Sequence, residues 1–231
     1  MGKISKLSAL RRMTDNLTGE QYLRHQQSGQ QFRRTVCALA WPMPPYPGCI
    51  TVVGEARYLP TVLGEPRHLW TLLEYQSPSQ SDLITTVEQV LWRYQTPRVI
   101  TPVDDDRYLL IEVHNDARRA ERKPPIRINT PIRWHGKGEG LMPYYLSLLQ
   151  RRLVDDKTLH MGQFYAAQDE YRMAQGNDDG VALMRASMSS WPALCALCWC
   201  IEAVDMQGDP MGSYAMGSGL PSGHADPLGG Y

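Results

Sequence analysis

Four prolines within one short segment constrain the fold of this chain more than any other feature. The segment Trp41-Pro-Met-Pro-Pro-Tyr-Pro-Gly48 lacks too many N–H donors to lie inside a helix. We therefore expect a rigid, extended connector there. We divide the sequence into three parts. Residues 1–48 form an N-terminal arm and helix that end in this connector, and residues 49–207 form an α/β domain. Residues 208–231 form a flexible tail rich in Gly, Pro and Ser.

The region before the connector is predicted to be a basic arm followed by a helix. Residues 1–16 are polar and basic, and Thr18-Gly-Glu-Gln21 fits a capping box. These features predict a helix over residues 20–38.

The region after the connector alternates between strand and helix signals. Short apolar runs predict strands at residues 49–53, 68–75, 98–101 and 126–132. Ser81 is placed to cap a helix that ends before Pro97, and further helices are predicted at 142–153 and 190–206. Residues 108–114 fit a strand or a helix equally well. Strands separated by a helix favour a crossover, so we predict a mixed, partly parallel central sheet with flanking helices.

Composition narrows the class of protein. Five cysteines, an odd number with three in one apolar run, argue against a disulfide framework and for buried, reduced thiols in a cytoplasmic protein. The apolar stretch 191–204 is too short to span a bilayer, so no membrane segment is predicted. Lys and Arg together equal Asp and Glu at 24 each, so net charge identifies no nucleic-acid partner.

Carboxylates follow two of the predicted strands and precede the last helix. If they converged, they could hold Mg²⁺ or Mn²⁺ and support phosphodiester hydrolysis. The alternative, which spacing alone favours, is that they are turn and cap residues. The candidate metal ligands are Glu55, Asp104, Asp106, Asp178 and Asp179, with Glu55, Asp104 and Asp178 as the catalytic set.

A basic segment follows the undecided element. Clustered arginines beside an aromatic residue suit contact with phosphates, but they could equally pair with Glu112, Asp116 and Glu121 on a solvated surface. The candidate nucleic-acid ligands are Arg118, Arg119, Arg122, Lys123, Arg127 and Arg133. The sequence contains no P-loop, so no ATPase activity is predicted.

Residues 50–205 resemble the RNase H-like nuclease domain of tailed-phage terminase large subunits. Ile50-Thr-Val-Val-Gly-Glu55 resembles the first strand with its metal-binding acid, and Arg98-Val-Ile-Thr101 with Asp104 resembles the second acidic position. Trp191-Pro-Ala-Leu-Cys-Ala-Leu197 resembles the terminal helix, with Asp178 or Asp179 nearest to the third acid.

The resemblance implies a Mg²⁺- or Mn²⁺-dependent endonuclease that cuts double-stranded DNA during phage genome packaging in the host cytoplasm. Other packaging or assembly proteins would then be partners. The sequence departs from the family in having Glu55 where Asp is typical. The alternative is therefore a catalytically inactive phage structural protein, or a DNA- or protein-binding protein, on the same fold.

Overall fold

The structure is a computed structural model, and it describes residues 9–42, 45–58, 66–131, 142–162, 165–176 and 191–206. The predicted C-terminal tail at 208–231 lies outside the described residues.

One eight-stranded sheet organises the described chain. Its strands are β1 (Leu10–Thr14), β2 (Gln21–His25), β3 (Gln31–Ala40), β4 (Gly48–Ala56), β5 (Leu69–Ser77), β6 (Val99–Ile100), β7 (Ile128–Asn129) and β8 (Leu159–His160). The helices are α1 (Gln80–Arg93), α2 (Asp105–Ala120), α3 (Met142–Gln150) with the π-helical turn η1 (Arg151–Asp155), α4 (Tyr165–Gly176) and α6 (Pro192–Met206).

Antiparallel and parallel pairings meet at β3. The strands β1 to β5 pair in succession as an antiparallel series. The other neighbours are parallel: β6 to β3, β7 to β6, and β8 to β5. This confirms the predicted mixed, partly parallel sheet.

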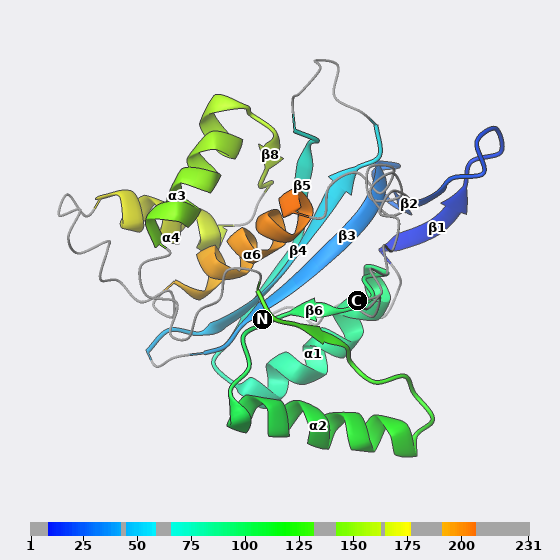
Figure 1. Cartoon of the computed structure of the whole chain (residues 1–231), viewed down its shortest axis with the longest axis vertical. Coiled ribbons are helices and arrows are strands. Elements are labelled where there is room, and N and C mark those ends of the chain that lie inside the picture. Colours follow the sequence, from blue (N-terminus) through cyan, green and yellow to red (C-terminus); the bar gives the residue numbers. More distant parts are fainter. Residues whose placement is uncertain are drawn as a thin grey trace, which may run out of the picture.

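Helices cover the sheet on both faces (Figure 1). On one side α1 packs against β3, β4 and β5, and α2 lies outside it. On the other side α6 packs against β3 and β4, with α3 and α4 beside it. Two buried apolar clusters therefore form, one on each face of the sheet.

The predicted N-terminal helix over residues 20–38 is wrong. This region forms β2 and most of β3, and β3 is a central strand of the sheet. The Thr18–Gln21 segment belongs to a hairpin turn, in which the Asp15 carboxylate accepts from the N–H groups of Leu17 and Thr18 and Gly19 has a φ of +72°. Pairing with β1 and β4 outweighs the local helix signal.

The elements after the connector agree with the sequence more closely. The four strands predicted in residues 49–132 are β4, β5, β6 and β7. The helix predicted from Ser81 is α1, but its N-cap is Ser79, whose hydroxyl accepts from the Asp82 N–H. The undecided residues 108–114 lie within α2.

Helix α6 contributes more residues to one apolar cluster than any other element does. Its residues from Pro192 to Val204 are all buried, as the apolar sequence predicts. All five cysteines are free thiols and buried, which confirms that prediction. Burial raises the pKa of each thiol. None of the helices in the described ranges is long and apolar enough to cross a membrane.

Candidate nucleic-acid interface

Glu55, the first candidate metal ligand, is held by two arginines. It is the last residue but one of β4, and its side chain is 5% exposed. Its Oε2 lies 2.5 Å from Nε of Arg34, and its Oε1 lies 3.4 Å from Nε of Arg67. Both carboxylate oxygens therefore face cations, an arrangement that suits a structural ion pair and leaves neither oxygen directed at a metal ion.

Asp104 caps a helix. Its Oδ1 accepts a hydrogen bond of 2.9 Å from the Arg107 N–H at the start of α2, and its Oδ2 lies 3.4 Å from the Arg107 guanidinium. Asp106 is exposed in the first turn of the same helix. Asp178 and Asp179 lie outside the described residues. The role seen for Asp104 is the capping alternative that the sequence left open.

The sheet separates Glu55 from Asp104. In the register of β3, Glu55 pairs with Arg34, whereas Ile100 of β6 pairs with Ala38. Four residues of strand correspond to about 13 Å, and the parallel strand β6 then leads away from Glu55. Within the described ranges, no group of three or more His, Cys, Asp or Glu side chains could hold a metal ion. The residues present there do not fit the metal that the resemblance implies.

The carboxyl ends of β3 and β6 are closed by packing. In open α/β sheets ligands bind where parallel strands end next to a reversal of strand order, and here that place is occupied by Trp41 and Pro102. The Trp41 indole N–H donates to the Pro102 carbonyl at 2.8 Å. Trp41 is 5% exposed and Thr101 is fully buried. This edge of the sheet therefore offers apolar packing in place of acidic side chains.

Two carboxylates missed by the sequence analysis, the half-buried Glu74 and the buried Glu170, lie on the α6 face. Glu74 of β5 accepts from the N–H groups of Ala166 and Ala167 at the start of α4. Glu170 of α4 accepts from the Leu194 N–H at 2.7 Å, at the start of α6. Burial raises the pKa of both, that of Glu170 to about 7. Each binds a helix N-terminus, so their positions are explained by helix capping. The sequence signal for Glu74 was its place in the predicted second strand.

The predicted nucleic-acid segment is largely neutralised by its own acids. Arg118 and Lys123 contact Glu88, Lys123 also contacts Glu121, and Arg119 pairs with Glu112 and Asp116. Arg127 is exposed, and no carboxylate in the described chain pairs with it or with Arg122. Arg133 lies outside the described residues.

A second basic site, which we call the arginine notch, lies where the sheet is interrupted. On one edge of β3, β2 pairs with residues 31–32 and β6 with residues 37–38. Across the gap between them lies a cavity of about 230 Å³. Its lining contains no acidic side chain: Arg12, Gln21, Tyr22, Leu23, Arg33, Arg34, Thr35, Gln95 and Pro97.

A β-bulge brings two consecutive arginines to the notch. Phe32 pairs with Ala56 and Arg34 with Glu55, so Arg33 is an extra residue in β3. Successive side chains of a regular strand point to opposite faces, but a bulge alters their direction. Arg33 and Arg34 thereby line one cavity, together with Arg12 of β1. Sequence analysis missed this site because it assigned the region to a helix, although the Arg33-Arg34 pair was visible.

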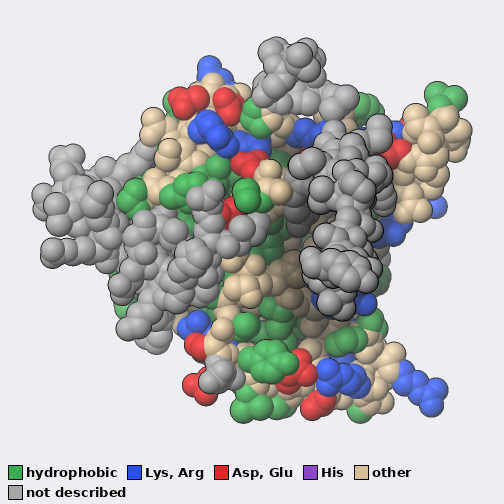
Figure 2. Space-filling view, viewed as in Figure 1, with side chains coloured by type: hydrophobic (Ala, Val, Ile, Leu, Met, Phe, Trp, Pro, Cys, Tyr) green, Lys and Arg blue, Asp and Glu red, His purple; other side chains and the backbone are tan. Residues whose placement is uncertain are grey.

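The strands around the notch are strongly basic. Together β1, β2 and β3 contain five arginines and no acid. Arg11 and Arg24 lie directly opposite each other in the register of β1 and β2, although like charges in that position destabilise a strand pair. Figure 2 shows basic side chains along the margin of the molecule where β1 lies, at the right of the view.

The strand order β5-β4-β3-β6-β7, with β6 and β7 parallel to β3, defines an RNase H-like α/β domain. No protein-family model and no curated protein matches the sequence. Among solved structures, the chain is similar to the nuclease domain of the large terminase g2p from bacteriophage SPP1, which was solved with bound Mn. The identity is 14%, the match covers 74% of this chain and 87% of that domain, and the TM-score is 0.47. That domain comes from the kind of protein that residues 50–205 resemble in sequence.

Proposed function

We propose that this domain binds the sugar–phosphate backbone of DNA through the arginine notch and does not cut it. The sequence resemblance suggests the setting, which is DNA packaging by a tailed phage in the host cytoplasm, with double-stranded DNA and other packaging or assembly proteins as partners. The role is that of the inactive, DNA-binding alternative raised by the sequence.

The observation that carries the proposal is the convergence of Arg12, Arg33 and Arg34 on one cavity without an acidic side chain in its lining. Guanidinium groups bind phosphate oxygens through paired N–H donors. Glu55 compensates only part of this charge, because it already contacts Arg67 as well as Arg34. Arg34 also donates to the Val204 carbonyl, so Arg12 and Arg33 are the cations through which the notch would attract a polyanion.

The opposed pair Arg11 and Arg24 supports the same conclusion. Like charges at directly facing positions cost stability, and β1 and β2 carry no acid to offset them. A DNA phosphate between or beside these side chains would offset the repulsion. The hairpin would then be more stable with DNA bound than without it.

Cutting is not proposed, because the described acids are assigned elsewhere. Glu55 is bound by arginines and Asp104 caps α2. The β3 residues that pair with Glu55 and with Ile100, the end of the strand before Asp104, are about 13 Å apart along the sheet. We therefore derive no catalytic step through Mg²⁺ or Mn²⁺.

Salt-dependent DNA binding tests the proposal. We expect purified protein to bind a fluorescent duplex with a steep salt dependence, and the variant Arg12→Ala/Arg33→Ala to lower the slope of log K against log salt by about 1.8, or 0.9 per lost phosphate contact. A matched control is Arg151→Ala/Arg172→Ala, which removes two exposed arginines from η1 and α4. The charge-preserving Arg12→Lys/Arg33→Lys should keep most of the slope.

Two results would overturn the proposal. An unchanged slope in the Arg12→Ala/Arg33→Ala variant, with its fold intact by circular dichroism, would remove the notch as the binding site. Plasmid nicking with Mg²⁺ or Mn²⁺ that disappears in Glu55→Ala/Asp104→Ala would show that the domain cuts DNA.

A further inference from the structure

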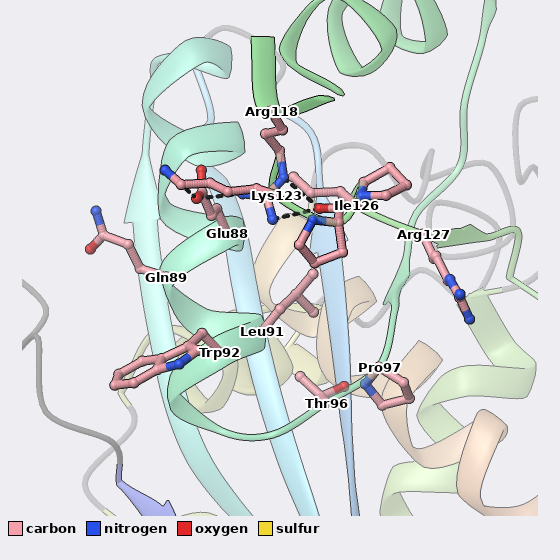
Figure 3. Close-up of a pocket in the computed structure, with 12 residues that line it drawn as sticks. Glu88, Gln89, Leu91, Trp92, Thr96, Pro97, Arg118, Lys123, Ile126 and Arg127 are labelled. Carbon is pink, nitrogen blue, oxygen red and sulfur yellow. Dashed lines mark hydrogen bonds and ion pairs between the residues drawn. The ribbon is translucent and has the colours of Figure 1, made fainter. Parts of the chain in front are cut away.

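A large apolar pocket lies next to the arginine notch (Figure 3). Its volume is about 670 Å³, within the range of pockets that bind small organic groups. The second half of α1 forms one wall and the segment after α2 forms the other. The apolar lining consists of Leu91, Trp92, Pro97, Pro124, Pro125 and Ile126.

The walls offer flat surfaces to a planar group. Trp92 is 57% exposed, so its ring is available at the pocket. Pro124 and Pro125 are exposed as well. Arg118 holds this segment in place by donating two hydrogen bonds to the Pro124 carbonyl, at 2.9 and 2.7 Å. Aromatic side chains bind bases of any identity by stacking.

The charge of the pocket favours an anionic ligand. Burial alone would raise the pKa of Glu88, but hydrogen bonding and charge from Arg118, together with Lys123 and His114, lower it, so the carboxylate is ionised and neutralised in place. Glu88 and Glu121 balance Arg118 and Lys123. Arg127 also lines the pocket, and no carboxylate in the described chain pairs with it, so it supplies the net positive charge. Figure 3 shows Arg127 on the side opposite Trp92.

The pocket and the notch share a wall. Pro97 lines both cavities, and the adjoining residues divide between them, with Thr96 in the pocket and Gln95 in the notch. A ligand with an apolar planar part and a phosphate could therefore reach both. An apolar peptide anchor would fill the pocket but would make no use of the arginine notch that shares its wall.

We infer that the pocket takes an unpaired base of single-stranded DNA, stacked at Trp92, while the neighbouring phosphates lie on the notch and on Arg127. This inference rests on the proposed DNA binding and adds the substrate class, which is DNA with an unpaired base beside or beyond its duplex. Bases in a duplex are stacked inside it, so duplex binding would use the notch alone.

Fluorescence anisotropy with two single strands tests the inference. One is an oligothymidylate, and the other has the same length and phosphates but abasic residues. We expect the protein to bind the thymidylate about five- to tenfold more tightly, near the lower range for one stacked base because Trp92 is partly exposed. Trp92→Ala should remove this difference, and its duplex affinity should stay unchanged.

Matched variants separate the pocket from general effects. Tyr108→Ala removes another exposed aromatic, which lies on α2 outside the pocket, and should preserve the preference for thymidylate. Arg127→Gln should weaken single-strand binding more than duplex binding.

The outcomes distinguish this inference from the proposed function. Equal binding of the thymidylate and abasic strands, with arginine-dependent duplex binding intact, would refute the inference that the pocket binds a base. The proposed function would stand, and the pocket would then fit an apolar side chain of a protein partner. Absence of duplex and single-strand binding at low salt would refute both proposals.

Discussion

Replacement of Glu55 by glutamine gives opposite results for a structural ion pair and for a metal ligand. In the structure the carboxylate lies between Arg34 and Arg67, and its side chain is only 5% exposed. Glu55→Gln keeps the shape and removes the charge, leaving two guanidinium groups beside a neutral amide. Removal of one partner from a buried ion pair is strongly destabilising because it leaves an uncompensated charge.

The expected loss is about 2–4 kcal/mol of unfolding free energy. Complete burial would give about 3–5 kcal/mol. The arginines are partly exposed, at 21% for Arg34 and 16% for Arg67, so water screens part of the unpaired charge and the estimate falls below that range. Arg34 also donates to the Val204 carbonyl at 3.0 Å, and this hydrogen bond remains in the variant.

Urea unfolding measures the loss, and Glu112→Gln provides the control. Glu112 pairs with Arg119 on the surface of α2, with side chains 31% and 50% exposed, so its loss should cost less than about 1 kcal/mol. A site evolved to hold metal would behave differently. Without metal its acids repel one another, so Glu55→Gln would be neutral or stabilising, and added Mg²⁺ would raise the stability of the wild type alone. Either result would refute the ion-pair interpretation.

Two further predictions concern carboxylates that bind helix N-termini. Asp104→Ala should lower the unfolding free energy by about 1 kcal/mol through loss of the α2 cap, whereas Asp106→Ala should change it little; equal effects in urea unfolding would contradict the capping role. Burial raises the pKa of Glu170 to about 7, so the folded state binds more protons than the unfolded state between about pH 4.5 and 7. Stability from this group is therefore complete below pH 4.5 and is lost as the pH rises through 7. Glu170→Gln should reduce that loss, measured as unfolding free energy at pH 5 and pH 8, and an unchanged pH dependence would show that Glu170 is not the group responsible.

The sequence predicted those elements whose apolar spacing and end residues lie within the element itself. The apolar face of α1, including Leu83, Val87 and Val90, has helical spacing and is buried as expected. The run at the start of β4 was recognisable because β-branched residues follow the proline-rich connector. Residues 108–114 were ambiguous from their own pattern, and the structure resolves the ambiguity because Asp104, four to ten residues upstream, caps the helix that contains them.

Non-local pairing explains the failures. Gly19 and Gly29, both with a φ of +72°, each lie in a turn between two strands. Their ten-residue spacing was a hairpin signal, but the capping-box pattern favoured a helix. The separation of Glu55 from Asp104 depends on which strand β6 joins, and the convergence of Arg33 and Arg34 depends on a bulge opposite β4. Neither property is set by residues near in sequence.

The five buried thiols allow the opening of the core to be measured by thiol labelling. Cys37 and Cys49 lie in adjacent central strands, and Cys195, Cys198 and Cys200 lie in the helix packed on them. Cys49, Cys195, Cys198 and Cys200 belong to the apolar cluster under α6, whereas Cys37 belongs to the cluster under α1. A thiol reagent in water reaches the first four only when α6 separates from the sheet, and burial keeps all five thiols protonated. Labelling kinetics therefore measure how often the helix and sheet separate. Bound DNA that stabilises the folded state would slow the rate of cysteine labelling, although the DNA contacts none of the cysteines.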